Sequence, residues 1–273
     1  MTSTDLDTQH VGIMHAGKIP LTYLAKRGIL SAIGQQVDGH GPVVPPDQRV
    51  LFCDISKWNG RVNFEIMKAA GAEGVYMRAS MGTMYPDPEF LASRVRVENV
   101  LPFGAYHALT VGDGAQQGHN FCTMLGDDPG LFPRVIDVEL LSVGANIVRA
   151  CVQHVYNVYQ EWPWIYTSVN YWPLVVGETD KRWIEERCGL WVAHWGTFSP
   201  LIPFKWLYRK LHQYSADGNK RGPEFGAPLG AEPDMDLSYM TRALYQTFLP
   251  AQSWEHEIDA WARTQGYNGP PPD

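Results

Sequence analysis

From residue 50 onward, short apolar segments alternate with stretches of helical pattern, and this alternation restricts the fold more than any other feature. Short apolar segments without strict polar alternation predict strands that are buried on both faces, as in parallel sheets. Each stretch of helical pattern then supplies the crossover that a parallel connection needs. The expected strands cover residues 50–54, 74–79, 103–107, 133–139, 164–168, 190–194, 210–214 and 235–237. The expected helices cover residues 62–70, 87–100, 115–125, 145–160 and, as a short piece, 171–176.

About eight strands joined in this way predict an α/β fold, a modified and irregular β/α TIM-like barrel over residues 50–241. The irregularity is expected because residues 197–234 are rich in glycine and proline and carry few helical signals. We therefore expect the later helices of an ideal barrel to be missing. Residues 1–49 are expected to form an N-terminal extension and linker of unknown function, with a helix over 21–37. Residues 242–273 are expected to form a C-terminal helical extension with a proline-rich tail.

The composition argues against several classes of function. A net charge of −7 disfavours a nucleic-acid partner and a membrane-surface role, because both depend on clustered lysine and arginine. No apolar run approaches the ~20 residues of a membrane span, so no membrane insertion is expected. Residues 1–18 lack the basic and apolar regions of a Sec signal peptide, which indicates synthesis and folding in a cytoplasm.

The four cysteines, Cys53, Cys122, Cys151 and Cys188, are far apart in the sequence. They form no Cys-x-x-Cys pair and no cysteine–histidine cluster with the spacing of zinc ligands. The chain also lacks a phosphate-binding loop and a Gly-x-Ser-x-Gly nucleophile motif. We therefore expect buried free thiols, no metal and no cofactor.

Polar residues gather where the expected strands end. In a parallel barrel the carboxyl ends of the strands meet at one mouth, where active sites lie. These residues are Asp54, Ser56, Arg78, Ser80, His107, Asp137, Glu139, Thr167, Ser168, His194, Gln213 and Asp236. Their convergence on one mouth is stronger evidence for a site than any single motif.

The tract over residues 134–139 ends an apolar strand with two carboxylates, Asp137 and Glu139. Residues two apart on a strand point to the same side, so both acids should face one cavity. Burial and mutual repulsion should raise one pKa and leave the other group ionised, as acid-catalysed sugar hydrolysis requires. The alternative is a structural role, an ion pair with Arg78 together with a helix cap.

Several residues near the mouth also have a structural explanation. Asp54 matches a turn-capping Asp-x-Ser, and Asp87 begins a helix that it is expected to cap. Asp236, taken alone, is undecided between structure and function, whereas His107 and His194 are expected to be core histidines. The aromatic residues are divided between sugar platforms and core packing, and the sequence does not sort them: Trp58, Tyr106, Tyr166, Trp191, Trp195 and Tyr214.

A series of motifs over residues 50–240 resembles glycoside hydrolase family 25, the Chalaropsis-type muramidases. The central motif, Asp137-Val138-Glu139, is similar to the family's Asp-x-Glu. The family's opening Asp-x-Ser-x-aromatic-x-Gly is matched by Asp54-Ile55-Ser56-Lys57-Trp58-Asn59-Gly60. The remaining matches, in order along the chain, are residues 78–83, 87–90, 104–107, 165–168, 190–193, 213–215 and 236–239.

The resemblance implies a modified β/α barrel that hydrolyses the β-1,4 bond between N-acetylmuramic acid and N-acetylglucosamine in bacterial peptidoglycan. By motif position, Glu139 looks like the general acid, and Asp137 would orient the 2-acetamido group of the substrate. Asp54 and Asp236 would be supporting carboxylates. We expect substrate assistance and retention of configuration. The expected substrate-binding residues are Ser56, Trp58, Arg78, Tyr106, Tyr166, Trp191, Gln213 and Tyr214.

Two other functions stay open on the sequence. A chitinase-like hydrolase of amino sugars usually has a further aspartate two residues before the acid pair, where this chain has Val135. A virion structural protein would reuse the barrel for wall binding, with the segments outside 50–241 mediating assembly. We expect a monomeric phage-type lysin that reaches the wall by holin-dependent release or acts within a virion. The loop over 218–233 is longer and more charged than the family pattern implies.

Overall fold

The computed structural model describes residues 43–249, apart from 141, 204–205, 207–208, 217–219 and 232–233. The expected helix over 21–37 and the tail beyond 249 lie outside the described residues, as does part of the charged loop over 218–233. Within the described part of the chain, no helix is both long and apolar enough to cross a membrane. All four cysteines are buried and form no disulfide, as the sequence predicts.

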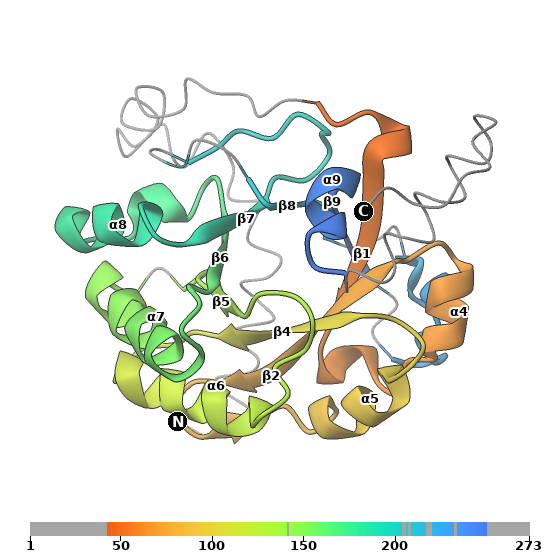
Figure 1. Cartoon of the computed structure of the whole chain (residues 1–273), viewed down its shortest axis with the longest axis horizontal. Helices are drawn as coiled ribbons and strands as arrows, with labels where there is room; N and C mark the ends of the chain where they lie inside the picture. Colours follow the sequence, from red (N-terminus) through yellow and green to blue (C-terminus); the bar gives the residue numbers. More distant parts are fainter. Residues whose placement is uncertain are drawn as a thin grey trace, which may run out of the picture.

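Eight strands close into a barrel (Figure 1), which confirms the predicted fold class. Around the ring the order is β1, β2, β4, β5, β6, β7, β8 and β9, and pairing of β9 with β1 completes the circle. The bounds are β1 Arg49–Ile55, β2 Gly74–Met81, β4 Phe103–Ala108, β5 Val135–Asp137, β6 Trp164–Ser168, β7 Gly189–Ala193, β8 Leu211–Ser215 and β9 Asp236–Thr241. A further strand, β3 (Tyr85–Pro86), forms an antiparallel hairpin with the end of β2.

The helices α4 to α8 lie around the outside of the strands (Figure 1). Their bounds are α4 Phe64–Ala69, α5 Phe90–Val97, α6 Gly114–Leu125, α7 Ala145–Tyr159 and α8 Glu178–Glu185. Between β7 and β8 the described residues form no α-helix, and between β8 and β9 they form only the 3-10 helix η6 (Gly222–Phe225). The expected loss of the later helices is therefore confirmed. Helix α8 was not expected, because its eight residues contain few apolar side chains that would reveal a helical period.

One strand contradicts the expectation of a parallel sheet. Strand β9 runs antiparallel to both of its neighbours, β8 and β1, whereas the other neighbouring strands of the barrel pair in parallel. Parallel neighbours need a crossover, usually a helix, and the described part of the β8–β9 connection holds only η6. The reversal brings the first residue of β9, rather than its last, to the end of the barrel where the other strands finish.

Aromatic side chains fill the barrel by lying over glycines of the next strand. Phe52 pairs in register with Gly74, and Tyr76 pairs in the same way with Gly104. A Cβ atom at either glycine would lie 2.3 or 2.4 Å from the aromatic ring of its partner. Trp164 repeats the arrangement further round the barrel, over Gly189. Alternation of large and small residues thus lets bulky rings pack inside a small barrel.

The helix α9 (Arg242–Gln246) closes the end of the barrel interior opposite the strand ends that carry the acids. Tyr245 packs edge-on against Phe52 at a ring separation of 6.1 Å and lies 6.0 Å from Phe132. Phe248 contacts the same cluster, 5.7 Å from Phe132. Residues beyond the boundary predicted at 241 therefore pack with the core of the barrel.

Candidate functional site

Two buried acids lie where β5 ends. Asp137 is the last residue of β5, and Glu139 follows two residues later, so the strand is shorter than predicted. The chain nevertheless stays extended, because Val138 N–H donates to Tyr166 O (2.9 Å) and Thr167 Oγ1 donates to Val138 O (2.9 Å). The two acids are 1% and 2% exposed. Tethering to β6 therefore holds Glu139 beyond the strand without exposing it.

A second pair of acids comes from β1 and β9. Asp54 and Asp236 are register partners across these antiparallel strands, and a side-chain hydrogen bond joins them. Asp54 is buried and Asp236 is half-buried. The two acids predicted to support the site are thus brought together.

Burial controls the protonation of these groups. Burial raises the pKa of Glu139 well above its usual range, and the neighbouring charges of Asp137 and Asp54 raise it further. Burial likewise raises the pKa of Asp54 to about 7, against a hydrogen bond from Gln213 that lowers it. These effects favour the protonated form of Glu139, the form that a proton donor requires.

Gln213 connects Asp54 with two aromatic side chains. Its Oε1 atom accepts hydrogen bonds from Tyr166 Oη (2.7 Å) and Trp195 Nε1 (2.8 Å). With two donors on the carbonyl oxygen, the amide nitrogen is turned toward Asp54 and donates to Asp54 Oδ2 (3.1 Å). Trp195 was among the aromatic residues that the sequence left unsorted between sugar platforms and core, and this hydrogen bond places it beside Gln213, two residues after the end of β7.

Five of the predicted residues line one cavity inside the mouth. They are Asp54, Tyr106, Asp137, Tyr166 and Trp191. The three rings belong to the aromatic cluster that fills the barrel interior. Their placement shows that core packing and lining of the cavity are combined in the same side chains.

The indole of Trp191 is anchored from β9. Its Nε1 atom donates to Ser238 Oγ at 3.1 Å. Ser238 was not predicted as a site residue. Its position two residues after Asp236, and hence on the same side of the strand, is the signal that would have found it.

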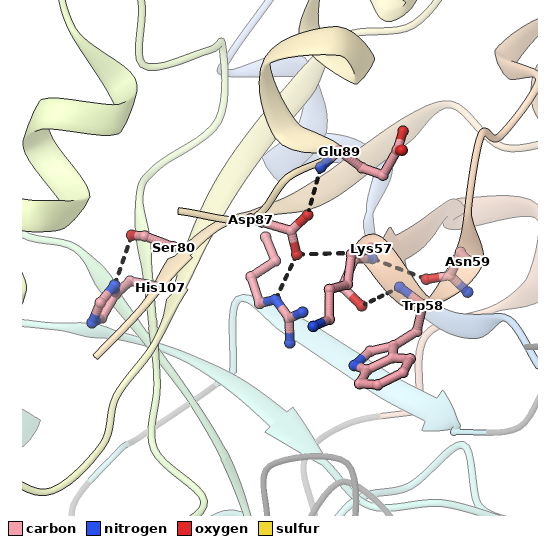
Figure 2. A network of polar contacts seen from close by, with 9 residues as sticks. Lys57, Trp58, Asn59, Ser80, Asp87, Glu89 and His107 are labelled. Carbon is pink, nitrogen blue, oxygen red and sulfur yellow. Dashed lines mark hydrogen bonds and ion pairs between the residues drawn. The ribbon is translucent and has the colours of Figure 1, made fainter. Parts of the chain in front are cut away.

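Ser56 and Trp58 lie in the turn that follows β1. Ser56 caps the 3-10 helix η3 (Lys57–Asn59), accepting from Trp58 N–H (3.4 Å) while its own N–H donates to Asn59 Oδ1 (2.9 Å) (Figure 2). The Trp58 ring has the Lys57 ammonium 4.6 Å from its centroid. Its Nε1 atom is buried and has no hydrogen-bond partner among the described residues. The structure therefore gives Ser56 a capping role and sets Trp58 beside the site.

Arg78 forms a buried ion pair with Asp87. Arg78 Nε donates to Asp87 Oδ2 at 2.8 Å, and both side chains are buried. The same oxygen accepts from Lys57 N–H (3.0 Å), and Oδ1 accepts from Glu89 N–H (3.0 Å) (Figure 2). Asp87 was expected to cap the following helix, but α5 begins later, with Glu89 as its N-cap. Through these contacts Asp87 instead connects β2, the η3 turn and the start of α5.

Tyr214 was predicted to bind substrate, but its side chain faces away from the cavity. It follows Gln213 on β8 and therefore points to the opposite face of the strand. There its ring lies 5.0 Å from Phe198 and 5.9 Å from Tyr239. His107 is fully buried and shares a hydrogen bond with Ser80, as expected of a core histidine (Figure 2).

The acidic mouth contains no recognisable metal site. Over the described ranges, no group of three histidine, cysteine, aspartate or glutamate side chains is arranged to hold an ion. The site combines a buried carboxyl with a raised pKa, a cluster of further acids and aromatic side chains, and this combination is suited to acid-assisted cleavage of a glycosidic bond.

Comparison with known protein families shows which family the chain is related to. The sequence profile of the glycosyl hydrolases family 25 matches residues 53–223. This chain belongs to that family. It is therefore a glycoside hydrolase, and the match contains Asp54, Asp137, Glu139 and Gln213, whereas Asp236 lies beyond it.

Relatives of this family 25 hydrolase include named lysozymes. Lysozyme M1 of Streptomyces globisporus is 28% identical over 203 residues, 65% of this chain and 68% of the relative. The N,O-diacetylmuramidase of Chalaropsis is 25% identical over 182 residues, 59% of this chain and 86% of the relative. The crystal structure of the CTP1L endolysin shares the fold at a TM-score of 0.61 and 20% identity, covering 73% of this chain and 69% of that one.

Proposed function

We propose that this family 25 hydrolase is a muramidase that cleaves the β-1,4 bond between N-acetylmuramic acid and N-acetylglucosamine in peptidoglycan. The observation that carries the proposal is Glu139, a buried carboxyl whose pKa is raised by burial and then by Asp137 and Asp54. The names of the Streptomyces and Chalaropsis relatives support the choice of substrate. Glu139 then acts as the general acid.

The reaction begins with transfer of the Glu139 proton to the glycosidic oxygen as the bond from that oxygen to C1 breaks. The carbonyl oxygen of the substrate's own 2-acetamido group attacks C1 from the opposite face and forms an oxazolinium ion. Asp137 accepts a hydrogen bond from the acetamido N–H, which orients the group and stabilises its positive charge. Water then attacks C1 as the bond from C1 to the oxazolinium oxygen breaks and the acetamido group is regenerated. The Glu139 carboxylate takes a proton from that water, and the configuration at C1 is retained.

Asp54, Asp236 and Gln213 support this machinery without touching the scissile bond. Gln213 holds Asp54 on one side and Tyr166 on the other. The negative charge of Asp54 raises the pKa of Glu139. Their proposed role is to keep the proton on Glu139 and to stabilise positive charge that develops at C1 in the transition state.

Replacement of the acid tests the assignment. Glu139→Gln keeps the shape and removes the proton donor, so we expect lysis of purified cell walls to be lost while folding, followed by circular dichroism, stays near normal. Glu65→Gln removes an exposed glutamate of α4 and serves as the matched control. Wall lysis by the Glu139→Gln protein at the rate of the control would reject the proposal.

The stereochemical outcome tests substrate assistance separately. Nuclear magnetic resonance of the first product released from a defined oligosaccharide should show the β-anomer. An initial α-anomer would mean inversion, and the 2-acetamido group would then have no covalent role. Release of reducing sugar from peptidoglycan but not from chitin would separate a muramidase from a chitinase-like hydrolase.

We further propose that the enzyme works as a phage-type lysin, as a monomer on peptidoglycan, and reaches the wall at lysis or within a particle. The shared fold of the CTP1L endolysin is consistent with this setting. Immunodetection in purified particles would assign it to the virion, whereas detection confined to lysing cells would assign it to holin-dependent release.

A further inference from the structure

A groove lies beside the acidic mouth, between the η3 turn and the hairpin of β2 and β3. Its volume is about 300 Å³, within the range of pockets that hold small ligands. The polar part of its lining is Lys57, Arg78 and Asp87, and the apolar part includes Met81, Tyr85 and Pro86. Lys57 and Asp87 are drawn together in Figure 2.

The groove adjoins the cavity that holds the acids. Tyr106 lines that cavity together with Asp54 and Asp137. Arg78 and Tyr106 are register partners on the neighbouring parallel strands β2 and β4. Arg78 also lines the groove. A substrate bound at the acids therefore has its substituents within reach of the groove.

The charge of the groove is opposite to that of the mouth. Two cations, Lys57 and Arg78, face one carboxylate, Asp87. That carboxylate is occupied by Arg78 Nε at 2.8 Å, Lys57 N–H at 3.0 Å and Glu89 N–H at 3.0 Å. Cationic side chains therefore outnumber acidic ones in the lining of the groove, on a chain whose net charge is −7. The groove therefore favours an anion.

We propose that this groove binds a carboxylate of the peptide carried by muramic acid, with the Lys57 ammonium as the principal contact. The inference rests on the proposed muramidase function and names a specificity determinant for it. The peptide starts next to the bond that is cut, and it combines free carboxylates with small apolar side chains. The carboxylates match Lys57, and the small side chains match the apolar wall of Met81, Tyr85 and Pro86.

Binding to an inactive protein gives the test, because it needs no turnover. In full-length chains carrying Glu139→Gln, titration calorimetry would compare a soluble disaccharide-peptide with the same disaccharide freed of its peptide. Lys57→Met keeps an unbranched side chain of similar length and removes the ammonium group, which lies 4.6 Å from the centroid of the Trp58 ring. We expect it to weaken binding of the disaccharide-peptide about tenfold, as loss of one charge-assisted hydrogen bond does. Binding of the peptide-free disaccharide should change less than twofold.

Two further variants serve as controls for Lys57→Met. Lys57→Arg keeps the charge and should restore binding of the disaccharide-peptide to within about threefold of the parent. Lys68→Met removes an exposed lysine on α4 and should leave both affinities unchanged. Equal weakening of both ligands by Lys57→Met would assign the contact to the sugar and overturn the peptide assignment. An unchanged affinity for the disaccharide-peptide would overturn it as well.

Two measurements distinguish failure of the groove assignment from failure of the proposed muramidase function. If the native chain releases no reducing sugar from peptidoglycan, the proposed muramidase activity fails. Lys57-dependent binding of the disaccharide-peptide would still support the groove. If the native chain cleaves peptidoglycan but Lys57→Met binds the disaccharide-peptide normally, the activity stands and the groove assignment fails.

Discussion

Asp54 and Asp236 are cross-strand partners on β1 and β9, and they share a hydrogen bond at the mouth of the barrel. The pairing exists because β9 runs against both neighbours, so that its first residue meets a residue near the end of β1. Burial raises the pKa of Asp54 to about 7. Protonation of Asp54 therefore links the stability of the fold to pH.

The first prediction concerns stability. The folded pKa of Asp54 is about 7, above its ordinary value of 3.8, so the folded state binds more protons than the unfolded state between these pH values. The free energy of unfolding must then fall as pH rises from about 4 to about 7. Asp54→Asn removes this contribution. Urea unfolding at several pH values should show the variant gaining roughly 2–4 kcal/mol on the native protein between pH 4 and pH 8.

Asp47→Asn, at an exposed position before β1, is the matched control for the loss of one carboxyl group. A constant difference between Asp54→Asn and the native protein across this pH range would show that folding does not raise the pKa of Asp54. The gain in stability should come with lower activity, as is common for strained groups at active sites.

The second prediction concerns the pH profile of the reaction. Burial, then Asp137, then Asp54 raise the pKa of Glu139. If Glu139 is the general acid, activity falls as pH rises through its pKa. Removal of the Asp54 charge should lower that pKa, so the alkaline limb of kcat/KM for the residual activity of Asp54→Asn should move to lower pH. A limb that stays in place or moves to higher pH would contradict the assigned coupling.

The acidic site was largely predictable from the sequence because its members stand where apolar strands end. Asp54, Asp137 and Glu139 were located on that basis alone. The direction of β9 was not predictable, since a short apolar strand has the same pattern in either direction. Asp236 was therefore assigned to the mouth correctly, but on the assumption of a parallel strand.

The alternation of side chains along β8 predicts that Gln213 and Tyr214 lie on opposite faces of the strand. Gln213 and Tyr214 are neighbours on β8, and only one of two neighbours can point into the barrel. Gln213 does so, whereas Tyr214 packs with Phe198 and Tyr239 on the other face. The η3 turn that removes Ser56 from strand geometry depends on its contact with Asn59. Such a local hydrogen bond is not visible as a period in the sequence.

The third prediction concerns the packing of rings over glycines. A Cβ atom at Gly104 would lie 2.4 Å from Cε1 of Tyr76, and the Tyr76 ring is fully buried in the barrel interior. Gly104→Ala should therefore lower the free energy of unfolding by about 1–3 kcal/mol in urea denaturation. Tyr76→Leu, which replaces the ring by a smaller side chain, supplies the matched background for a double-mutant cycle.

In the Tyr76→Leu background, Gly104→Ala should lower the free energy of unfolding by a smaller amount, because the added methyl group then has room. The coupling energy between the two substitutions is expected to be about 1 kcal/mol or more. Additive effects would show that the loss comes from the strand backbone and not from contact with the ring.

The last prediction concerns the closure of the barrel by α9. Tyr245 is 8% exposed, its ring lies 6.1 Å from that of Phe52, and its hydroxyl donates to Glu73 O at 3.0 Å. Tyr245→Ala should lower the free energy of unfolding by about 3 kcal/mol, because it opens a cavity beneath the aromatic cluster. Tyr245→Phe keeps the ring and should cost only about 1 kcal/mol, the value of the lost hydrogen bond. Equal losses for the two variants would assign the stabilisation to the hydroxyl. A negligible loss for Tyr245→Ala would show that α9 adds nothing to the barrel, and the catalytic domain would then end with β9.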